Sequence, residues 1–181
     1  ILSGLYGLVV TTKAQIRQSL LAAAKQRQYD PVALANAILQ QPAVKQAKRI
    51  GVYMALPSEP GLAQFIDRVS VPLALPVYDA DANRYVFRAF VPSQTGLVRG
   101  KDGCLAPGIE SPLVAQLDAI LVPCVAVDKQ GNRLGRGRGV YDQLLADHPT
   151  VAIGVVYPQH VLDRLPVEPH DQPVHAVVLA K

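Results

Sequence analysis

The chain has 181 residues, of which 50% are hydrophobic and 18% are charged, and its formal net charge is +4. This composition excludes an intrinsically disordered protein, because such a chain can bury a substantial core. No apolar run reaches the length needed to cross a bilayer, so we expect a protein that neither spans nor binds a membrane. We predict a single domain over residues 1–181.

The two cysteines, Cys104 and Cys124, lie far apart and lack any metal-ligand spacing. A disulfide between them is not required, so we expect a reducing compartment and a cytoplasmic location. The apolar stretch from Ile1 to Val10 has neither a basic flank before it nor a cleavage site after it. We therefore do not interpret it as a targeting segment.

Two helices are predicted first. Thr12 to Gln28 has a threonine cap, good helix formers and one apolar side. Lys13 and Arg17 are four residues apart, so they share a face near the start of this helix. Two cations at the positive end of a helix are unfavourable unless an anion lies there, although two solvated side chains would give the same pattern. Asp30-Pro31 then caps a second helix that reaches about Gln40.

Strands with a short helix follow. β-Branched and apolar residues predict a strand over Arg49 to Leu56, and Glu59 is the only acid in the loop after it. Ligands bind in loops at the carboxyl ends of strands in α/β sheets, but Glu59 is equally suited to begin a helix over Gly61 to Val69. Val71 to Val77 and Arg84 to Phe90 are two further strands, and the Asp/Asn/Ala turn between them indicates a hairpin.

The second half alternates exposed segments with apolar strands. Gln94 to Pro112 is rich in glycine and proline and is predicted as an exposed excursion that carries or covers a site. The remaining elements are predicted as strands over Ala119 to Val127, Thr150 to Tyr157 and Val174 to Leu179, with a short helix or turn over Gln159 to Leu165. Strands that are apolar on both faces and alternate with helices predict an α/β fold, with a mostly parallel central sheet covered on both faces.

The stretch from Asp128 to Asp142 joins a buried strand to a helix over Val140 to Ala146, and it alternates glycines with arginines. Glycines let backbone N–H groups approach a ligand, the helix start adds a positive dipole, and arginines match phosphate or carboxylate oxygens. A solvated hairpin tip can have the same composition. There is no Gly-Lys-Ser/Thr ending, and Val140 stands where a dinucleotide fingerprint requires glycine. We predict a phosphate-binding loop of another kind.

Two acids near this loop are candidate magnesium ligands. Asp142 lies in the helix after the loop, and Asp171 lies in a late loop. Paired carboxylates beside a polyphosphate bind Mg²⁺, although each acid is equally suited to be a cap or a solvated charge. The histidines show no metal-ligand or triad pattern; they are His148, His160, His170 and His175. Acyl-enzyme chemistry is therefore not supported.

With these parts in order, the chain resembles the 5-formyltetrahydrofolate cyclo-ligase family, also called 5,10-methenyltetrahydrofolate synthetases, over nearly its whole length after Thr11. The most specific part, Asp128 to Asp142, is close to the family signature Asp-x-x-Gly-x-Arg-Leu-Gly-x-Gly-x-Gly-Tyr-Tyr-Asp. The supporting parts are Lys13-x-x-x-Arg17, Tyr53 with Glu59, and Leu165-Pro166-x-Glu168-x-His170-Asp171.

The resemblance implies a three-layer fold of the NagB/RpiA/CoA-transferase type and an ATP-dependent ligase that forms a C–N bond. Such an enzyme cyclises 5-formyltetrahydrofolate to 5,10-methenyltetrahydrofolate and releases ADP and phosphate. ATP phosphorylates the formyl oxygen, the folate nitrogen at position 10 attacks the activated carbon, and phosphate departs. The expected partners are these small molecules and no nucleic acid, and the expected assembly is a monomer or a weak homodimer.

The resemblance also implies roles for individual residues. The ATP-binding residues would be Lys13, Arg17, Arg133, Leu134, Gly135, Arg136, Gly137, Arg138, Gly139, Val140 and Tyr141. The folate would contact Met54, Glu59, Arg136, Gly137, Arg138, Gly139 and Val140. Arg136 and Arg138 would neutralise the charge that develops during phosphoryl transfer, which makes them the expected catalytic residues. Asp142 and Asp171 would hold Mg²⁺.

Some positions depart from the family pattern. Val140 replaces the first tyrosine of the usual pair, and Ala106-Pro107 stands where the family tends to have an acid before proline. These changes keep open a second hypothesis, a catalytically weak or inactive paralogue that binds nucleotide or folate. A third hypothesis, an RNA-contacting Arg-Gly loop, has less support, because no aromatic residues are interleaved with the single Arg-Gly-Arg-Gly unit.

Overall fold

A mostly parallel six-stranded sheet forms the centre of the protein, as predicted. The computed structural model describes residues 12–24, 27–92, 97–101 and 103–181, so the prediction about Ile1 to Val10 lies outside the described residues. In spatial order the strands are β11 (Ala176–Leu179), β9 (Val151–Val156), β6 (Ala119–Pro123), β1 (Ile50–Gly51), β2 (Leu73–Asp79) and β3 (Arg84–Phe90). All neighbours are parallel except β2 and β3, which form the predicted antiparallel hairpin.

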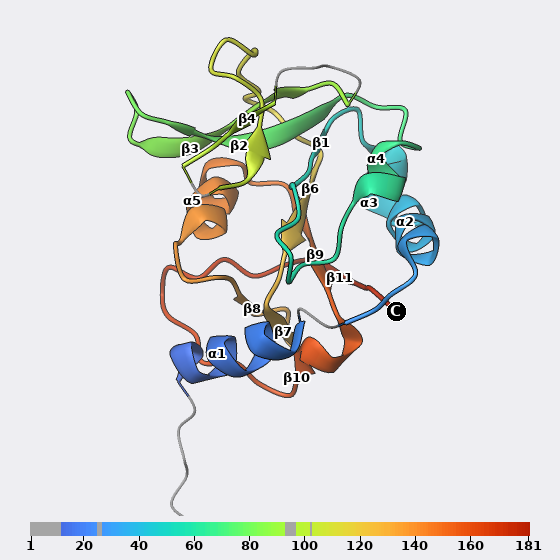
Figure 1. Cartoon of the computed structure of the whole chain (residues 1–181), viewed down its shortest axis with the longest axis vertical. Helices are drawn as coiled ribbons and strands as arrows, with labels where there is room; N and C mark the ends of the chain where they lie inside the picture. The colour runs from blue at the N-terminus through green and yellow to red at the C-terminus, as the bar shows by residue number, and fades with distance from the viewer. Residues whose placement is uncertain (1–11, 25–26, 93–96, 102) are drawn as a thin grey trace, which may run out of the picture.

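Helices cover both faces of this sheet, which confirms the predicted layers (Figure 1). One face is covered by α2 (Pro31–Leu39), α3 (Pro42–Gln46) and α4 (Ala63–Ile66), and the other by α5 (Val140–Asp147). Successive strand residues point to opposite faces. In β2, Leu73 and Leu75 pack in the core beside α2 to α4, whereas Ala74 packs in the core that contains Leu144 of α5. The strands are therefore apolar on both faces.

A smaller sheet lies beside the central one and carries the glycine-rich loop. It contains β10 (Val161–Leu162), β7 (Ala126–Asp128) and β8 (Arg133–Leu134), and η1 (Pro158–His160) precedes β10. Helix α1 (Lys13–Ala24) packs against this sheet through Ile16, Leu20 and Leu21, as Figure 1 shows below β7 and β8. The first helix of the chain thus supports the loop that follows β8.

The predicted single strand over Ala119 to Val127 is wrong, because the structure divides it into β6 and β7 in different sheets. The N–H of Cys124 still bonds to Val155 of the central sheet, but the N–H of Val125 bonds to Leu134 O of β8 at 2.9 Å. The chain changes its partner at this point because β8, which the sequence did not predict as a strand, offers a second set of backbone acceptors.

Several other boundaries differ from the predictions. Of the strand expected over Arg49 to Leu56, only β1 is observed, although the N–H of Val52 still bonds to Ala74 O. The helix expected over Gly61 to Val69 is the single turn of α4, and residues 27 and 28 are not helical. The segment after Tyr157 forms η1 and then β10, and the exposed excursion contains a hairpin of β4 (Val98–Arg99) and β5 (Leu105–Ala106). None of the described helices is long and apolar enough to span a bilayer.

Candidate active site

A pocket of about 990 Å³ lies where β8 leads into α5. Its wall comes mainly from the start of α1, the segment after β1, the loop before α5 and residues 166–171. All residues assigned from the sequence line it, namely Lys13, Arg17, Met54, Glu59, Arg133, Leu134, Gly135, Arg136, Gly137, Arg138, Gly139, Val140, Tyr141, Asp142 and Asp171. The volume is at the upper end of the roughly 300–1,000 Å³ of small-molecule pockets.

Two glycines of the loop have left-handed backbone conformations. Gly137 has φ of 92° and Gly139 has φ of 67°, in the left-handed region that other residues rarely adopt. Gly139 is the N-cap of α5, and no side chain caps this helix. Because Gly139 and the first residues of α5 line the pocket, the positive end of the helix dipole lies at the pocket wall, where it favours an anion.

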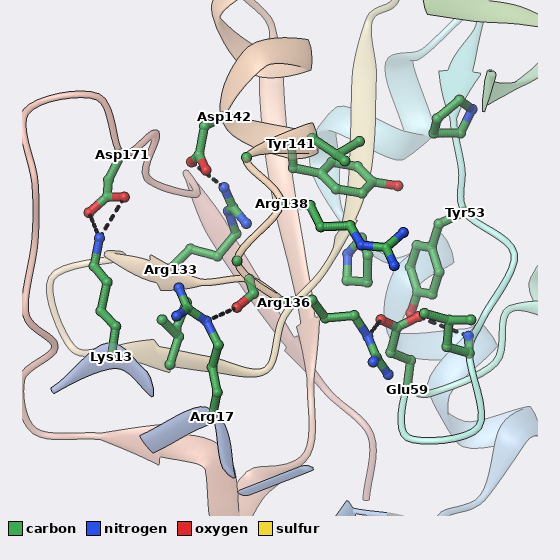
Figure 2. A pocket seen from close by; sticks show the side chains of 18 of the residues that line it. Lys13, Arg17, Tyr53, Glu59, Arg133, Arg136, Arg138, Tyr141, Asp142 and Asp171 are labelled. Atoms are coloured by element: carbon green, nitrogen blue, oxygen red, sulfur yellow. Dashed lines mark hydrogen bonds and ion pairs between the residues drawn. The ribbon is translucent and has the colours of Figure 1, made fainter. Parts of the chain in front are cut away.

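Helix α1 supports the loop from below through Arg17. The Nε atom of Arg17 donates to the carbonyl oxygen of Gly135 at 2.8 Å, and Figure 2 shows this contact beneath the loop. A Cβ atom added at Gly137 would lie 3.3 Å from the Arg17 Cζ atom. The guanidinium thus packs directly against the glycine backbone. The charge of Arg17 adds to the positive potential at the loop.

Lys13, one turn earlier in α1, is held by two acids. Its Nζ atom lies 2.6 Å from an oxygen of Glu168 and 2.6 and 2.8 Å from the two oxygens of Asp171. Burial by itself would lower the pKa of Lys13, but hydrogen bonds and charges from Asp171 and Glu168 outweigh it and raise the pKa. The amine is therefore protonated at neutral pH, and its charge is paired with the carboxylates of Glu168 and Asp171.

Arg133 and Asp142 form a second ion pair at the same end of the pocket. The Arg133 guanidinium lies 2.5 Å from Asp142 Oδ1, and its side chain is only 2% exposed. The backbone N–H of Gln172 also donates to this oxygen at 3.1 Å. Such a buried guanidinium fixes the start of α5 to β8, and it orients the Asp142 carboxylate.

Asp128 anchors the turn that precedes β8. Its buried carboxylate accepts N–H groups from Gln130, Asn132 and Leu165 and the side-chain amide of Asn132, at 2.9 to 3.0 Å. Burial would raise the pKa of Asp128, but these four donors outweigh it and lower the pKa. Because Leu165 begins the segment that leads to Glu168 and Asp171, Asp128 holds two walls of the pocket together.

The predicted magnesium ligands, Asp142 and Asp171, are carboxylates, which suit a hard cation. In the structure a cationic side chain contacts each of them. Figure 2 shows Asp142 and Asp171 at the same end of the pocket. Potential ligand atoms of Glu168, His170 and Asp171 lie within 4.8 Å of one another. Carboxylate oxygens suit Mg²⁺. Lys13 contacts both Glu168 and Asp171, so its amine shares these oxygens with any metal that binds there.

The opposite wall is built by the segment after β1. The Tyr53 hydroxyl donates to Pro60 O at 2.6 Å, and the N–H of Leu56 donates to Glu59 Oε2 at 2.9 Å. Burial, and then the charge of Glu59, raise the pKa of Tyr53, so its hydroxyl stays protonated and holds the turn. This turn presents a carboxylate and the side chain of Met54 to the pocket.

Arg136 and Arg138 leave the loop in different ways. Arg136 reaches the opposite wall, where its Nε atom donates to Glu59 Oε1 at 2.8 Å, and it also bonds to the Ser58 hydroxyl. Figure 2 shows Arg138 extending from the loop into the pocket. Val140 lies in the first turn of α5 and packs against the core on that face. The structure therefore places two long cationic side chains between the glycine loop and the wall that carries the Glu59 carboxylate.

Sequence reasoning missed several residues of this site. Ser58, Glu168, Cys104 and Leu105 contact the predicted residues or line the pocket, and none was assigned a role. Ser58 had one signal, since it is a polar residue in the loop after the first strand. Cys104 and Leu105 lie in the excursion over Gln94 to Pro112 that was predicted to carry or cover a site, but no signal in the sequence singled out these two residues within it.

Comparisons with known proteins agree on one family. A sequence model of the 5-formyltetrahydrofolate cyclo-ligase family matches residues 9–180. The 5-formyltetrahydrofolate cyclo-ligase of Mycolicibacterium smegmatis is 32% identical over 148 residues, which cover 74% of this chain and 74% of that protein. The Escherichia coli enzyme of the same name is 30% identical over 155 residues, which cover 80% of this chain and 84% of that protein.

Solved structures agree with the sequence relatives. The NMR structure of Aquifex aeolicus 5,10-methenyltetrahydrofolate synthetase matches with a TM-score of 0.80 and 28% identity, over 93% of this chain and 90% of that one. A Mycoplasma pneumoniae 5,10-methenyltetrahydrofolate synthetase has the same fold, with a TM-score of 0.67 and 20% identity, over 93% of this chain and 99% of that one. By its sequence and its fold, the chain belongs to the 5-formyltetrahydrofolate cyclo-ligase family.

Proposed function

We propose that this pocket binds ATP and 5-formyltetrahydrofolate together and closes the folate ring between them. The family is one of ATP-dependent ligases of one-carbon folate metabolism, and the chain is such an enzyme. The single observation that carries the location of the reaction is the convergence of cations from separate elements. Lys13 and Arg17 of α1 and Arg136 and Arg138 of the loop line one pocket, opposite the Glu59 wall.

The polyphosphate of ATP is proposed to lie on the loop and the start of α5. The left-handed glycine backbone at Gly137 and Gly139, which line the pocket, and the positive end of the α5 dipole favour phosphate oxygens there. Lys13 and Arg17 supply full charges from the adjacent helix. The folate is proposed to lie toward Glu59 and Met54, where a carboxylate can accept N–H groups of the pterin ring and apolar atoms can contact it.

The reaction is then a phosphoryl transfer followed by ring closure. The formyl oxygen attacks the γ-phosphorus, and the bond from that phosphorus to the β-phosphate bridging oxygen breaks, so ADP leaves. The folate nitrogen at position 10 attacks the activated carbon, and phosphate leaves with the former formyl oxygen and that nitrogen's proton. Arg136 and Arg138 would neutralise the transferring group, and no protein nucleophile is needed, because positioning and electrostatics carry such transfers.

Asp142 and Asp171 are the proposed ligands of Mg²⁺, and Glu168 lies beside Asp171. A bound Mg²⁺ would supply charge neutralisation for the phosphates. The protein's part is to hold the two carboxylates in place, through Arg133 at Asp142 and through the N–H of Glu168 at Asp171, at 2.7 Å. We further propose that the chain works as one catalytic domain on these small molecules, as a monomer or a weak homodimer.

The test is the absorbance of the methenyl product after the protein is mixed with 5-formyltetrahydrofolate, ATP and Mg²⁺. We expect a rise that requires ATP and that is abolished when a chelator removes Mg²⁺. An unchanged rate in the chelator would contradict the metal assignment. A flat trace in a protein that still binds ATP would contradict the catalytic assignment and favour the inactive paralogue, for which the substitution at Val140 is the first candidate cause.

A further inference from the structure

Arg136 forms a bridge between the two walls of the pocket. It belongs to the glycine loop, and its partner Glu59 is 77 residues away in the sequence, in the turn after β1. The Nε atom of Arg136 donates to Glu59 Oε1 at 2.8 Å, and a terminal nitrogen of the same guanidinium bonds to the Ser58 hydroxyl. Figure 2 shows this side chain reaching from the loop to Glu59. The proposed ATP wall is thus tied to the proposed folate wall.

Glu59 requires such a partner. Its side chain is only 8% exposed, whereas that of Arg136 is 34% exposed. A carboxylate that is so poorly hydrated is costly unless cations or N–H donors occupy its oxygens. One oxygen accepts the N–H of Leu56, and the other accepts Arg136. Arg136 therefore occupies the Glu59 oxygen that is left to receive N–H groups of the folate.

A polyphosphate competes for the same guanidinium. Arg136 lies between Gly135 and Gly137, on the loop to which we assign the phosphates, and Arg17 and Lys13 approach the same region. Several phosphate charges attract a guanidinium more strongly than one carboxylate does, and bidentate pairing with phosphate adds to this. When Arg136 turns to the phosphates, Glu59 loses a partner that its burial requires, and the N–H donors of a pterin replace that partner.

We infer that Ser58 and Glu59 hold Arg136 on the folate wall in the free protein, and that bound nucleotide releases it, so that ATP strengthens folate binding. The inference rests on the proposed function, since it uses the proposed locations of both substrates. Ser58 is then a positioning residue: it is buried, it is not among the residues that line the pocket, and it acts through Arg136. By linkage, folate strengthens ATP binding by the same factor.

The experiment is calorimetric titration of 5-formyltetrahydrofolate into the protein, alone and with a saturating non-hydrolysable ATP analogue and Mg²⁺. We expect the wild-type Kd to fall about tenfold when nucleotide is present, which is within the usual range of coupling between sites. Ser58→Ala removes the hydrogen bond between Arg136 and the Ser58 hydroxyl. It should lower the Kd for folate about threefold in the absence of nucleotide, roughly the contribution of one hydrogen bond, and should reduce the coupling by the same factor.

The controls separate this inference from structural damage and from failure of the proposed function. Ser58→Thr keeps the hydroxyl and should retain wild-type coupling, and Ser70→Ala changes an exposed serine outside the pocket and should have no effect. Damage at Ser58 would weaken folate binding rather than strengthen it. Equal folate Kd values with and without nucleotide, or unchanged coupling in Ser58→Ala, overturn the inference even if the enzyme turns over. Absence of turnover overturns the proposed function instead.

Discussion

Replacing Asp128 with asparagine should destabilise the protein by about 3 kcal/mol, because the structure gives this carboxylate four N–H donors. Each oxygen accepts two of them, and one donor is the buried N–H of Leu165. Asparagine keeps one oxygen and directs its own NH₂ group at the other two donors. Hydrogen bonds to charged groups contribute about 1.5–3 kcal/mol each. The loss of two is partly offset because a charge is no longer buried.

Urea unfolding at neutral pH, followed by circular dichroism, measures this change. With a slope of about 2 kcal/mol per molar urea, the midpoint should fall by about 1.5 M. Asp81→Asn is the matched control, since Asp81 is exposed in the β2–β3 turn and its carboxylate accepts no described hydrogen bond, so its effect should stay within about 0.5 kcal/mol. A midpoint in Asp128→Asn that equals that of the control would refute the reasoning.

The pH dependence gives a second check. The pKa of Asp128 is lowered in the folded protein, so the unfolded chain binds the proton first as the pH falls. The stabilisation is therefore fully present above about pH 4, the ordinary range of an unfolded aspartate, and is lost as the pH drops through the folded pKa. The stability difference between wild type and Asp128→Asn should shrink below that pH, and a constant difference would show that charge plays no part.

Three further predictions concern the pocket and the core. Arg138→Ala should lower kcat/KM for ATP about 10- to 100-fold, because a charge-assisted contact is lost. The exposed control Arg164→Ala should not lower it, and equal kcat/KM values for the two variants would exclude Arg138 from the site. Gly137→Ala should lower ATP affinity at least tenfold in titration, because φ is 92° and the new Cβ would lie 3.3 Å from Arg17 Cζ. Burial raises the pKa of Cys124 to about 12, so a thiol reagent at neutral pH should not modify it until urea unfolds the protein; rapid labelling of both cysteines in the folded protein would contradict this.

Elements that depend on local chemistry could be predicted from the sequence. The helix after Asp30 begins where its carboxylate accepts the N–H groups of Val32 and Ala33, and the hairpin before Arg84 turns at Asn83, whose φ is 50°. The proposal that the loop before α5 is an anion site also comes from local chemistry, because glycines, arginines and a helix start lie together in the sequence. Strand segments that are apolar on both faces likewise predicted the parallel sheet and its two helical layers.

Only the tertiary structure decided which distant residues meet. Arg17 supports Gly135 across 118 residues, and Arg136 contacts Glu59 across 77, and neither pairing has a signal in the local sequence. The same holds for the change of sheet after Pro123, where β8 supplies the acceptor for Val125. Hydrophobic periodicity and capping residues indicate which face of a segment is buried and where a helix begins and ends. They do not report which of several available partners a backbone group or a charge will take, and those choices place the two walls of the site opposite each other.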